Sequence, residues 1–456
     1  MTEAQLRRIP SIDALIQSLT DASEEGIPHP IALKAARYVL KQVRTEALAG
    51  TNVPELPEIR SLVVAAAEAM QAPSLRPVIN ATGVLLQTNL GRAPLSDRAI
   101  EAMNSAAAGY TNLEFDLAEG ERGSRHNHVR ELIHAVTGAE DGIAVNNNAA
   151  AIMMALDVFA KGREVIISRG EAVEIGGGFR IPDVLRQSGT TLVEVGTTNR
   201  TYAIDYRAAI TEETAAVLRV HRSNFAVVGF TAQPDLREVV EVAQNEQVLF
   251  LDDLGSGCLI DTAPYGIAHE PTVQESIEAG VDLVFFSGDK LIGGPQCGII
   301  AGRTELIGRL RAHPLARALR VDKLTIAALN ATLQSYAAGN EASEVPLWRM
   351  LSATQEELNT RAERWVTAGG EMAATVQGLS MVGGGSLPGE GVPTPCVALR
   401  TTIGADSAAR FLRGWDTPII GRVETGAVVL DPRAVRPADD AAVERALAVL
   451  ANMSPS

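Results

Sequence analysis

The chain has 456 residues, of which 46% are hydrophobic and 21% charged, and its formal net charge is -15. This length exceeds what one core holds and predicts two or three globular domains, while the acidic charge excludes indiscriminate nucleic-acid binding. No apolar run of eighteen residues and no signal peptide occurs, which predicts a cytoplasmic protein without a membrane partner. Three distant cysteines (Cys258, Cys297 and Cys396) lack metal-ligand spacing, so neither a disulfide framework nor a metal site is expected.

Residues 1–60 are predicted to form a helical N-terminal domain. Apolar residues recur at helical spacing over 11–19 and 31–48, with glycine and prolines between them, and residues 51–57 are predicted to be a linker. One face of the second helix carries four basic side chains and no acid: Lys34, Arg37, Lys41 and Arg44. We interpret this basic stripe as an RNA-binding surface that tracks phosphates; a solvated helix face is the alternative.

Residues 61–335 are predicted to form a large α/β domain. Short β-branched runs alternate with helical segments, at 142–145, 164–168, 191–195, 216–220, 248–252, 283–287 and 298–301. This alternation predicts a mostly parallel sheet with helices on both faces. Residues 336–456 are predicted to form a small α+β domain, with a helix at 346–369, a Gly- and Pro-rich strand pair, a strand at 423–430 and a helix at 439–451.

The first motif with chemical meaning is Val145-Asn146-Asn147-Asn148-Ala149, where a strand runs into a helix. Free N–H groups at a helix start favour an anion, such as a cofactor phosphate. Helix capping by asparagine is the simpler alternative, but three consecutive asparagines exceed what capping needs.

The second motif is Phe250-Leu251-Asp252-Asp253-Leu254-Gly255, an apolar strand that ends in two acids. Ligands of such sheets bind beyond the carboxyl ends of the strands, where an acid can pair with a protonated pyridine nitrogen. Side chains alternate along a strand, so only one of Asp252 and Asp253 can face the ring, and both remain candidates. A helix-capping pair and a metal-binding pair are the alternatives, although no second acidic cluster supports a metal.

The third motif is Ser287-Gly288-Asp289-Lys290-Leu291-Ile292-Gly293-Gly294-Pro295, after the apolar strand 281–286. Small neighbours let a backbone approach closely, and a lysine amine can then form a Schiff base with an aldehyde. An exposed turn lysine is the alternative for this motif alone. The order of the three motifs, which suit phosphate, ring nitrogen and aldehyde, favours pyridoxal phosphate and the aminotransferase-like (fold type I) architecture.

Longer phrases resemble the bacterial selenocysteine synthase family, the L-seryl-tRNA(Sec) selenium transferases. They lie at 79–84, 88–95, 110–116, 123–125, 146–150, 168–171, 174–182, 253–257 and around Lys290. The resemblance runs almost end to end and includes the helical N-terminal unit, where the family has a tRNA-binding domain. One departure is Arg222, between His221 and Ser223, where the family has a small hydroxyl residue. The role of this loop is left open.

The resemblance implies an enzyme that converts seryl-tRNA(Sec) to selenocysteinyl-tRNA(Sec) with selenophosphate, through a pyridoxal phosphate external aldimine and an aminoacrylyl-tRNA. It implies that Lys290 carries the Schiff base and that Asp289, Arg92, Arg317 and Arg320 are active-site residues, the last two on one helix face. Cofactor contacts are expected from Lys290, Asp253, Asn146, Asn147, Asn148 and Ser287. It also implies a homo-oligomer, a homodecamer built from dimers.

Two other functions remain open. A lyase acting on a small amino-acid or amino-sugar phosphate has the same fold and lysine motif, but less need of the helical N-terminal unit. A catalytically idle RNA-binding or scaffold protein is the other, and the combination of lysine, strand-end acid and anion loop argues against it.

Overall fold

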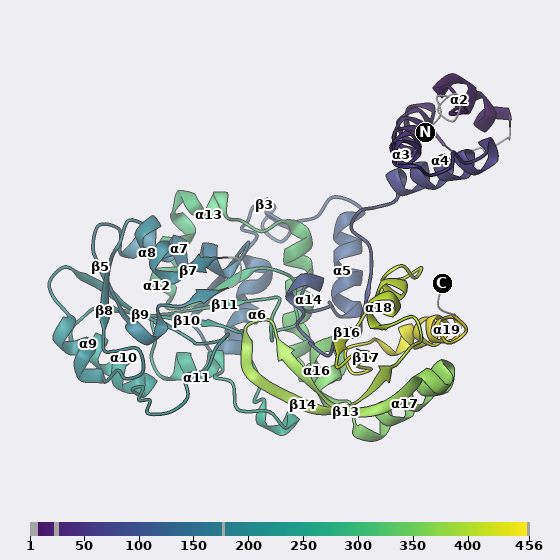
Figure 1. Ribbon diagram of the computed structural model, residues 1–456. Helices are drawn as coiled ribbons and strands as arrows, with labels where there is room; N and C mark the ends of the chain where they lie inside the picture. The colour runs from purple at the N-terminus through teal and green to yellow at the C-terminus, as the bar shows by residue number, and fades with distance from the viewer. Residues whose placement is uncertain (1–7, 22–26, 176–177, 454–456) are drawn as a thin grey trace. The chain divides into compact units, whose positions relative to one another are not determined.

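The computed structural model describes residues 8–21, 27–175 and 178–453 (Figure 1). The chain divides between Pro77 and Val78 into two compact units. The helical N-terminal unit therefore extends to Pro77, beyond the predicted boundary at residue 60. Within the described ranges, no helix is long and apolar enough to cross a bilayer.

The N-terminal unit contains the helices α2 (Ile12–Asp21), α3 (His29–Ala49) and α4 (Leu56–Gln71). The predicted linker is wrong at its end, because α4 begins at Leu56 with a proline in its first turn. Ile59 and Val63 of α4 are buried in one core with Val39 and Val43 of α3. The four residues of the basic stripe are exposed on the opposite face of α3: Lys34, Arg37, Lys41 and Arg44.

A seven-stranded sheet, in the order β4-β12-β11-β10-β9-β5-β8, is the centre of the second unit. Its strands are β4 (Asp141–Val145), β5 (Glu164–Ser168), β8 (Thr191–Val195), β9 (Thr214–Val220), β10 (Leu249–Gly255), β11 (Leu283–Ser287) and β12 (Gly298–Gly302). All seven predicted strands are present. Only β12 runs antiparallel to its neighbours, so the mostly parallel sheet is confirmed.

Helices cover both faces of this sheet because its strands are apolar on both sides. Phe250 packs with α6 (Asn127–Thr137), α10 (Leu236–Asn245), α11 (Val273–Glu278) and α14 (Lys323–Ala337). Its neighbour Leu251 packs on the other face with α7 (Asn148–Phe159), α8 (Ile181–Gln187) and α12 (Thr304–Ala312). The alternation along β10 therefore decides which face each side chain serves.

The C-terminal part has a four-stranded antiparallel sheet, in the order β13-β14-β17-β16. Its strands are β13 (Ala373–Gly383), β14 (Ser386–Leu399), β16 (Arg422–Glu424) and β17 (Ala427–Leu430), packed against α17 (Gln355–Gly369), α18 (Ala405–Arg413) and α19 (Asp440–Ala451). The predicted helix 346–369 is two helices, α16 (Pro346–Ser352) and α17, since Thr354 caps a new start. The predicted strand 423–430 is a hairpin that turns at Thr425 and Gly426, both at positive φ.

The first strand of the second unit packs with the C-terminal part of the chain. Strand β1 (Ile79–Asn80) pairs in parallel with β15 (Ile419–Ile420), and Ile79 is buried in the C-terminal core. The predicted division at residue 335 does not separate two compact units, because residues 78–456 form one. The remaining elements are η1 (Thr88–Leu90), α5 (Asp97–Ala107), β2 (Phe115–Asp116), β3 (Glu121–Arg122), η2 (Arg169–Glu171), β6 (Glu174–Ile175), β7 (Phe179–Arg180), α9 (Ala203–Ala209), η3 (Ala263–Tyr265), α13 (Pro314–Ala318), α15 (Glu341–Glu344), η4 (Gly370–Met372) and η5 (Pro437–Asp439).

Candidate active site

Lys290 and Asp253 border one small buried space at the carboxyl edge of the sheet. Lys290 follows β11 and Asp253 lies near the end of β10, and their exposed fractions are 6% and 3%. A Cβ atom placed on Gly255 would lie 3.8 Å from Lys290 Nζ and 3.7 Å from Asp253 Oδ1. The neighbouring strands β10 and β11 thus bring the amine and the carboxylate of the second and third motifs together.

The two aspartates of β10 face opposite sides. Asp253 accepts a hydrogen bond from Asn148 Nδ2 at 2.8 Å, on the side of Lys290. Asp252 is fully buried on the other side, where it accepts from Arg219 Nε and Nη2, both at 2.7 Å, and from Ser276 Oγ at 2.7 Å. Asp253 is therefore the acid on the lysine side, while Asp252 is occupied by an internal ion pair.

Burial moves both ionisable groups toward neutrality. It raises the pKa of Asp253 to about 6, against the Asn148 hydrogen bond and the positive field of Lys290. It also lowers the pKa of Lys290, against the negative field of Asp253. A lysine that loses its proton more easily than usual is suited to nucleophilic attack on a carbonyl and to proton abstraction.

Arg92 reaches the lysine turn through a strained loop. Its guanidinium lies 2.8 Å from the Asp289 carboxylate, and Ala93 N donates to Asp289 O at 3.4 Å. Arg92 has φ 63°, in the left-handed region that a side chain rarely adopts. Strain of this kind clusters at functional sites. The structure brings three predicted residues together: Arg92, Asp289 and Lys290.

Arg317 and Arg320 do not share a helix face, contrary to the prediction, because α13 ends at Ala318. The segment at Arg320 instead lies beside the asparagine loop, since Leu319 O accepts from Asn146 N at 2.9 Å. Arg320 Nη1 lies 3.8 Å from Glu114 Oε1. Arg317 is exposed and makes no ion pair with any residue that the structure describes.

The three asparagines have different surroundings. Asn147 caps α7, accepting from Ala150 N at 2.9 Å, and Asn148 donates to Asp253. The side chain of Asn146 is exposed, and Ser287 is buried at the end of β11. Two of the three asparagine side chains are thus occupied within the protein, and the start of α7 offers mainly its backbone N–H groups to an anion.

Buried polar atoms with unused hydrogen-bonding capacity surround this space. Among the described residues, no hydrogen bond reaches Asn148 Oδ1, Ser256 Oγ or Ser386 Oγ, and His221 Nε2 has the Glu270 carboxylate 3.3 Å away without a well-formed hydrogen bond. Their segments adjoin Asp253 and Lys290: His221 N donates to Asp253 O at 2.8 Å, Leu291 N donates to Ser256 O at 3.0 Å, and a Cβ on Gly385 would lie 3.5 Å from Lys290 Nζ. Unpaired buried polar atoms beside an amine and a carboxylate suit a flat, polar cofactor such as pyridoxal phosphate.

Three residues near this space were not predicted as site residues: Ser256, His221 and Ser386. Their signal in the sequence is weak, because each is a polar residue in a loop close to a strand end. Only the folded chain shows that these loops converge on Lys290.

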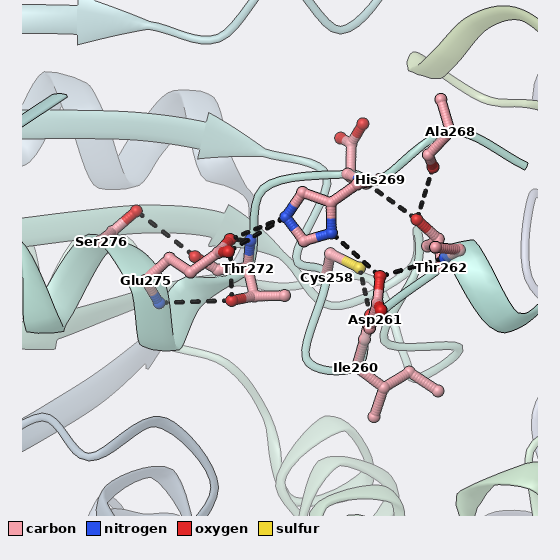
Figure 2. Close-up of polar contacts among 11 residues, drawn as sticks. Cys258, Ile260, Asp261, Thr262, Ala268, His269, Thr272, Glu275 and Ser276 are labelled. Carbon is pink, nitrogen blue, oxygen red and sulfur yellow. Dashed lines mark hydrogen bonds and ion pairs between the residues drawn. The ribbon is translucent and has the colours of Figure 1, made fainter. Parts of the chain in front are cut away.

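In the loop after β10, the His269 ring bridges two carboxylates (Figure 2). His269 Nδ1 lies 2.9 Å from Asp261 Oδ1 and its Nε2 lies 3.0 Å from Glu275 Oε1. The hydrogen bond with Asp261 raises the pKa of His269, with Glu275 adding to the effect. The next residue is Glu270, a buried carboxylate whose Oε1 lies 3.3 Å from His221 Nε2.

Arg222 lines a polar cavity of about 500 Å³ on the α9–α10 side of the sheet edge. Glu171, Arg219 and His221 also line it. Burial raises the pKa of Glu171 to about 7, against a hydrogen bond from Val220 N. The departure at Arg222 therefore lies beside the candidate site rather than between Lys290 and Asp253.

Fold and site together define an α/β enzyme of aminotransferase-like architecture with a buried lysine amine. Its fold is similar to the solved structure of D-glucosaminate-6-phosphate ammonia-lyase, with a TM-score of 0.59 and 23% identity, covering 83% of this chain and 96% of that one. At this identity the likeness shows the fold alone.

The family is shown by the sequence comparisons. The family model described as L-seryl-tRNA selenium transferase matches residues 78–436. A protein named L-seryl-tRNA(Sec) selenium transferase from Geobacter metallireducens is 47% identical, covering 98% of this chain and 99% of that protein. One of the same name from Moorella thermoacetica is 46% identical, covering 97% and 96%. The chain belongs to the L-seryl-tRNA selenium transferase family.

Proposed function

We propose that this protein converts seryl-tRNA(Sec) to selenocysteinyl-tRNA(Sec) in the cytoplasm, with pyridoxal phosphate as cofactor and selenophosphate as selenium donor. The observation that carries the proposal is the buried Lys290 beside Asp253, in a chain that matches transferases of this name over almost its whole length. The unpaired buried atoms around the pair agree with a bound cofactor.

Each residue of the site has a physical task in this reaction. When bound, pyridoxal phosphate supplies an aldehyde and an electron-withdrawing ring that acidifies the carbon next to the substrate amine. Lys290 would hold the cofactor as a Schiff base, with loss of water, and would be free to accept the acidified proton once the substrate amine has replaced it; its lowered pKa suits it to both tasks. Asp253 would accept a hydrogen bond from the protonated ring nitrogen and stabilise its charge. Arg92, oriented by Asp289, would supply a cation for the anionic selenium donor.

An absorbance titration tests the proposal. Purified protein with pyridoxal phosphate is titrated with seryl-tRNA(Sec), beside a Lys290→Ala control. We expect a Schiff-base band that the control lacks and that shifts only with the charged tRNA. A band that ignores the tRNA but shifts with a small amino-acid or amino-sugar phosphate would indicate the lyase, and no band at all would indicate a protein without this chemistry.

The basic stripe of α3 is proposed to bind the tRNA. Its four cations are exposed on one helix face, beside the half-exposed ring of Tyr38. Changing Lys34, Arg37, Lys41 and Arg44 to glutamate should abolish tRNA binding and leave the Lys290 band intact. The matched control reverses two exposed arginines of α18, Arg410 and Arg413. Unchanged tRNA affinity in the stripe variant would refute this assignment.

We infer that the protein works as a homo-oligomer, in line with the decamer that the family resemblance implies. Large apolar side chains project from two loops, with Tyr110 and Leu117 in one and Val228 and Phe230, 92% and 85% exposed, in the other. Exposure on this scale is typical of subunit interfaces. The double variant Val228→Asp, Phe230→Asp should have a lower oligomer mass in analytical ultracentrifugation. An unchanged mass would show that this loop is not part of the subunit interface.

A further inference from the structure

The carboxylate of Asp253 presents a problem that the lysine alone does not solve. An ionised acid is needed opposite a ring nitrogen, yet burial of Asp253 favours the neutral acid. A second cation beside Asp253 would stabilise the ionised carboxylate, but it would also pair with the carboxylate in competition with the ring nitrogen. A neutral donor supports the ionised form and leaves the whole negative charge available to the ring nitrogen.

Asn148 supplies such a donor. Its Nδ2 lies 2.8 Å from Asp253 Oδ1, the single side-chain hydrogen bond to Asp253 in the described part of the chain. Asn147 already caps α7, so the amide of Asn148 is not needed for capping. Its NH₂ group is directed at the carboxylate, while its Oδ1 atom is buried with no hydrogen-bond partner among the described residues.

The backbone of Asn148 is held in place by close packing against β12. A Cβ atom on Gly298 would lie 2.3 Å from Asn147 O and 2.7 Å from Asn148 N, so only glycine fits there. This contact fixes the start of α7 against the sheet. The amide of Asn148 therefore reaches Asp253 from a rigid support.

We propose that Asn148 is a positioning residue that keeps Asp253 ionised and aimed at the ring nitrogen of the cofactor. The inference rests on the proposed function and deepens it. It also replaces the predicted contact between the Asn148 side chain and the cofactor phosphate with a contact to the acid.

The test measures the dissociation constant of pyridoxal phosphate across a range of pH. A hydrogen bond to a charged group is strong enough that Asn148→Ala should weaken cofactor binding at neutral pH by about tenfold or more. Without the Asn148 hydrogen bond the pKa of Asp253 should rise. The fall in cofactor affinity on acidification should therefore begin at a higher pH than in the native protein. Asn148→Ser, which retains a donor at a helix start, should recover part of the loss and serves if Asn148→Ala does not fold. Asn104→Ala, which removes an exposed asparagine side chain of α5 outside the site, should behave as the native protein.

A double-mutant cycle separates positioning from a structural role. In an Asp253→Asn background, Asn148→Ala should cost little more, because the charge that it supports is gone. Equal losses in both backgrounds, or a loss by the same factor at every pH, would overturn the proposal. If Asn148→Ala binds like the native protein while Lys290→Ala loses its band, Asn148 has no such role and the proposed function stands. If the native protein binds no pyridoxal phosphate, the proposed function itself fails.

Discussion

Two adjacent aspartates at the end of β10 face opposite sides of the sheet because side chains alternate along a strand. Strand alternation alone predicts that only one of them faces the site. The choice between them depends on Arg219 of β9 and Ser276 of α11, which hold Asp252 on the far side. These partners are distant in the chain, so the sequence could not identify them. Asn148 was likewise predicted as a site residue from the sequence, but only the fold shows that its side chain donates to Asp253.

The aspartates should respond differently to the same substitution. Asp252→Asn removes the counter-ion of the partly buried Arg219; breaking a fully buried pair costs roughly 3–5 kcal/mol of unfolding free energy, and we expect a loss toward the lower end of this range. Asp253→Asn should not destabilise the protein comparably but should weaken cofactor binding. Urea unfolding and cofactor titration measure the two effects, and equal stability losses would contradict the division of tasks.

The pH dependence of stability should also report Asp253. Its pKa is raised on folding from 3.8 to about 6, so the folded protein binds more protons than the unfolded chain between these values. Cofactor-free protein therefore loses stability from this group as pH rises from about 4 to 6. Asp253→Asn should remove this contribution from the pH profile of Tm; a profile identical to the native one would show that Asp253 is not perturbed.

We expect that the charge of Arg92 is needed for activity, although its left-handed backbone conformation costs stability. Glycine relieves a left-handed conformation by about 1 kcal/mol relative to alanine, so Arg92→Gly should unfold at higher urea than Arg92→Ala. Both variants should lose selenium transfer, because neither places a cation beside Asp289. If Arg92→Ala were as stable as Arg92→Gly, the backbone strain would be absent.

The loop between β10 and α11 depends on an exposed clamp. His269 bridges Asp261 and Glu275 (Figure 2). The same loop places Glu270 Oε1 3.3 Å from His221 Nε2. A histidine whose pKa is raised on folding contributes stability below its unfolded pKa, and this is lost as pH rises through the folded pKa. His269→Gln should therefore lower Tm slightly at acidic pH and not at pH 9, with less effect in high salt. A loss that persists at pH 9 would show a packing role instead.

At the level of elements, apolar runs located the central sheet well. Six of the seven strands, all except β8, are buried along nearly their whole length and consist mainly of apolar residues, so composition marks them. Helix α4 was missed because Pro57 in its first turn looks like a loop residue, although proline is favoured there. The hairpin β16–β17 was missed because Thr425, at φ 47°, is not a residue expected in the left-handed region.

For the whole molecule, two separate cores predict two unfolding transitions. The N-terminal unit buries Val63 among its own helices, and the second unit is organised around its own sheet. Val63→Asp places a charge in the smaller core and should lower one calorimetric transition while the other stays in place. A single transition that moves as a whole would show that the units unfold together.

The domain division was the least predictable feature, because it depends on pairing between distant segments. The Arg422 guanidinium donates to Thr82 O across 340 residues, next to the pairing of β1 with β15. A newly made chain emerges from the ribosome N-terminus first. Strand β1 must therefore wait, with one edge open, until nearly the entire polypeptide has been synthesised, and a nascent chain truncated before β15 should remain a client for chaperones.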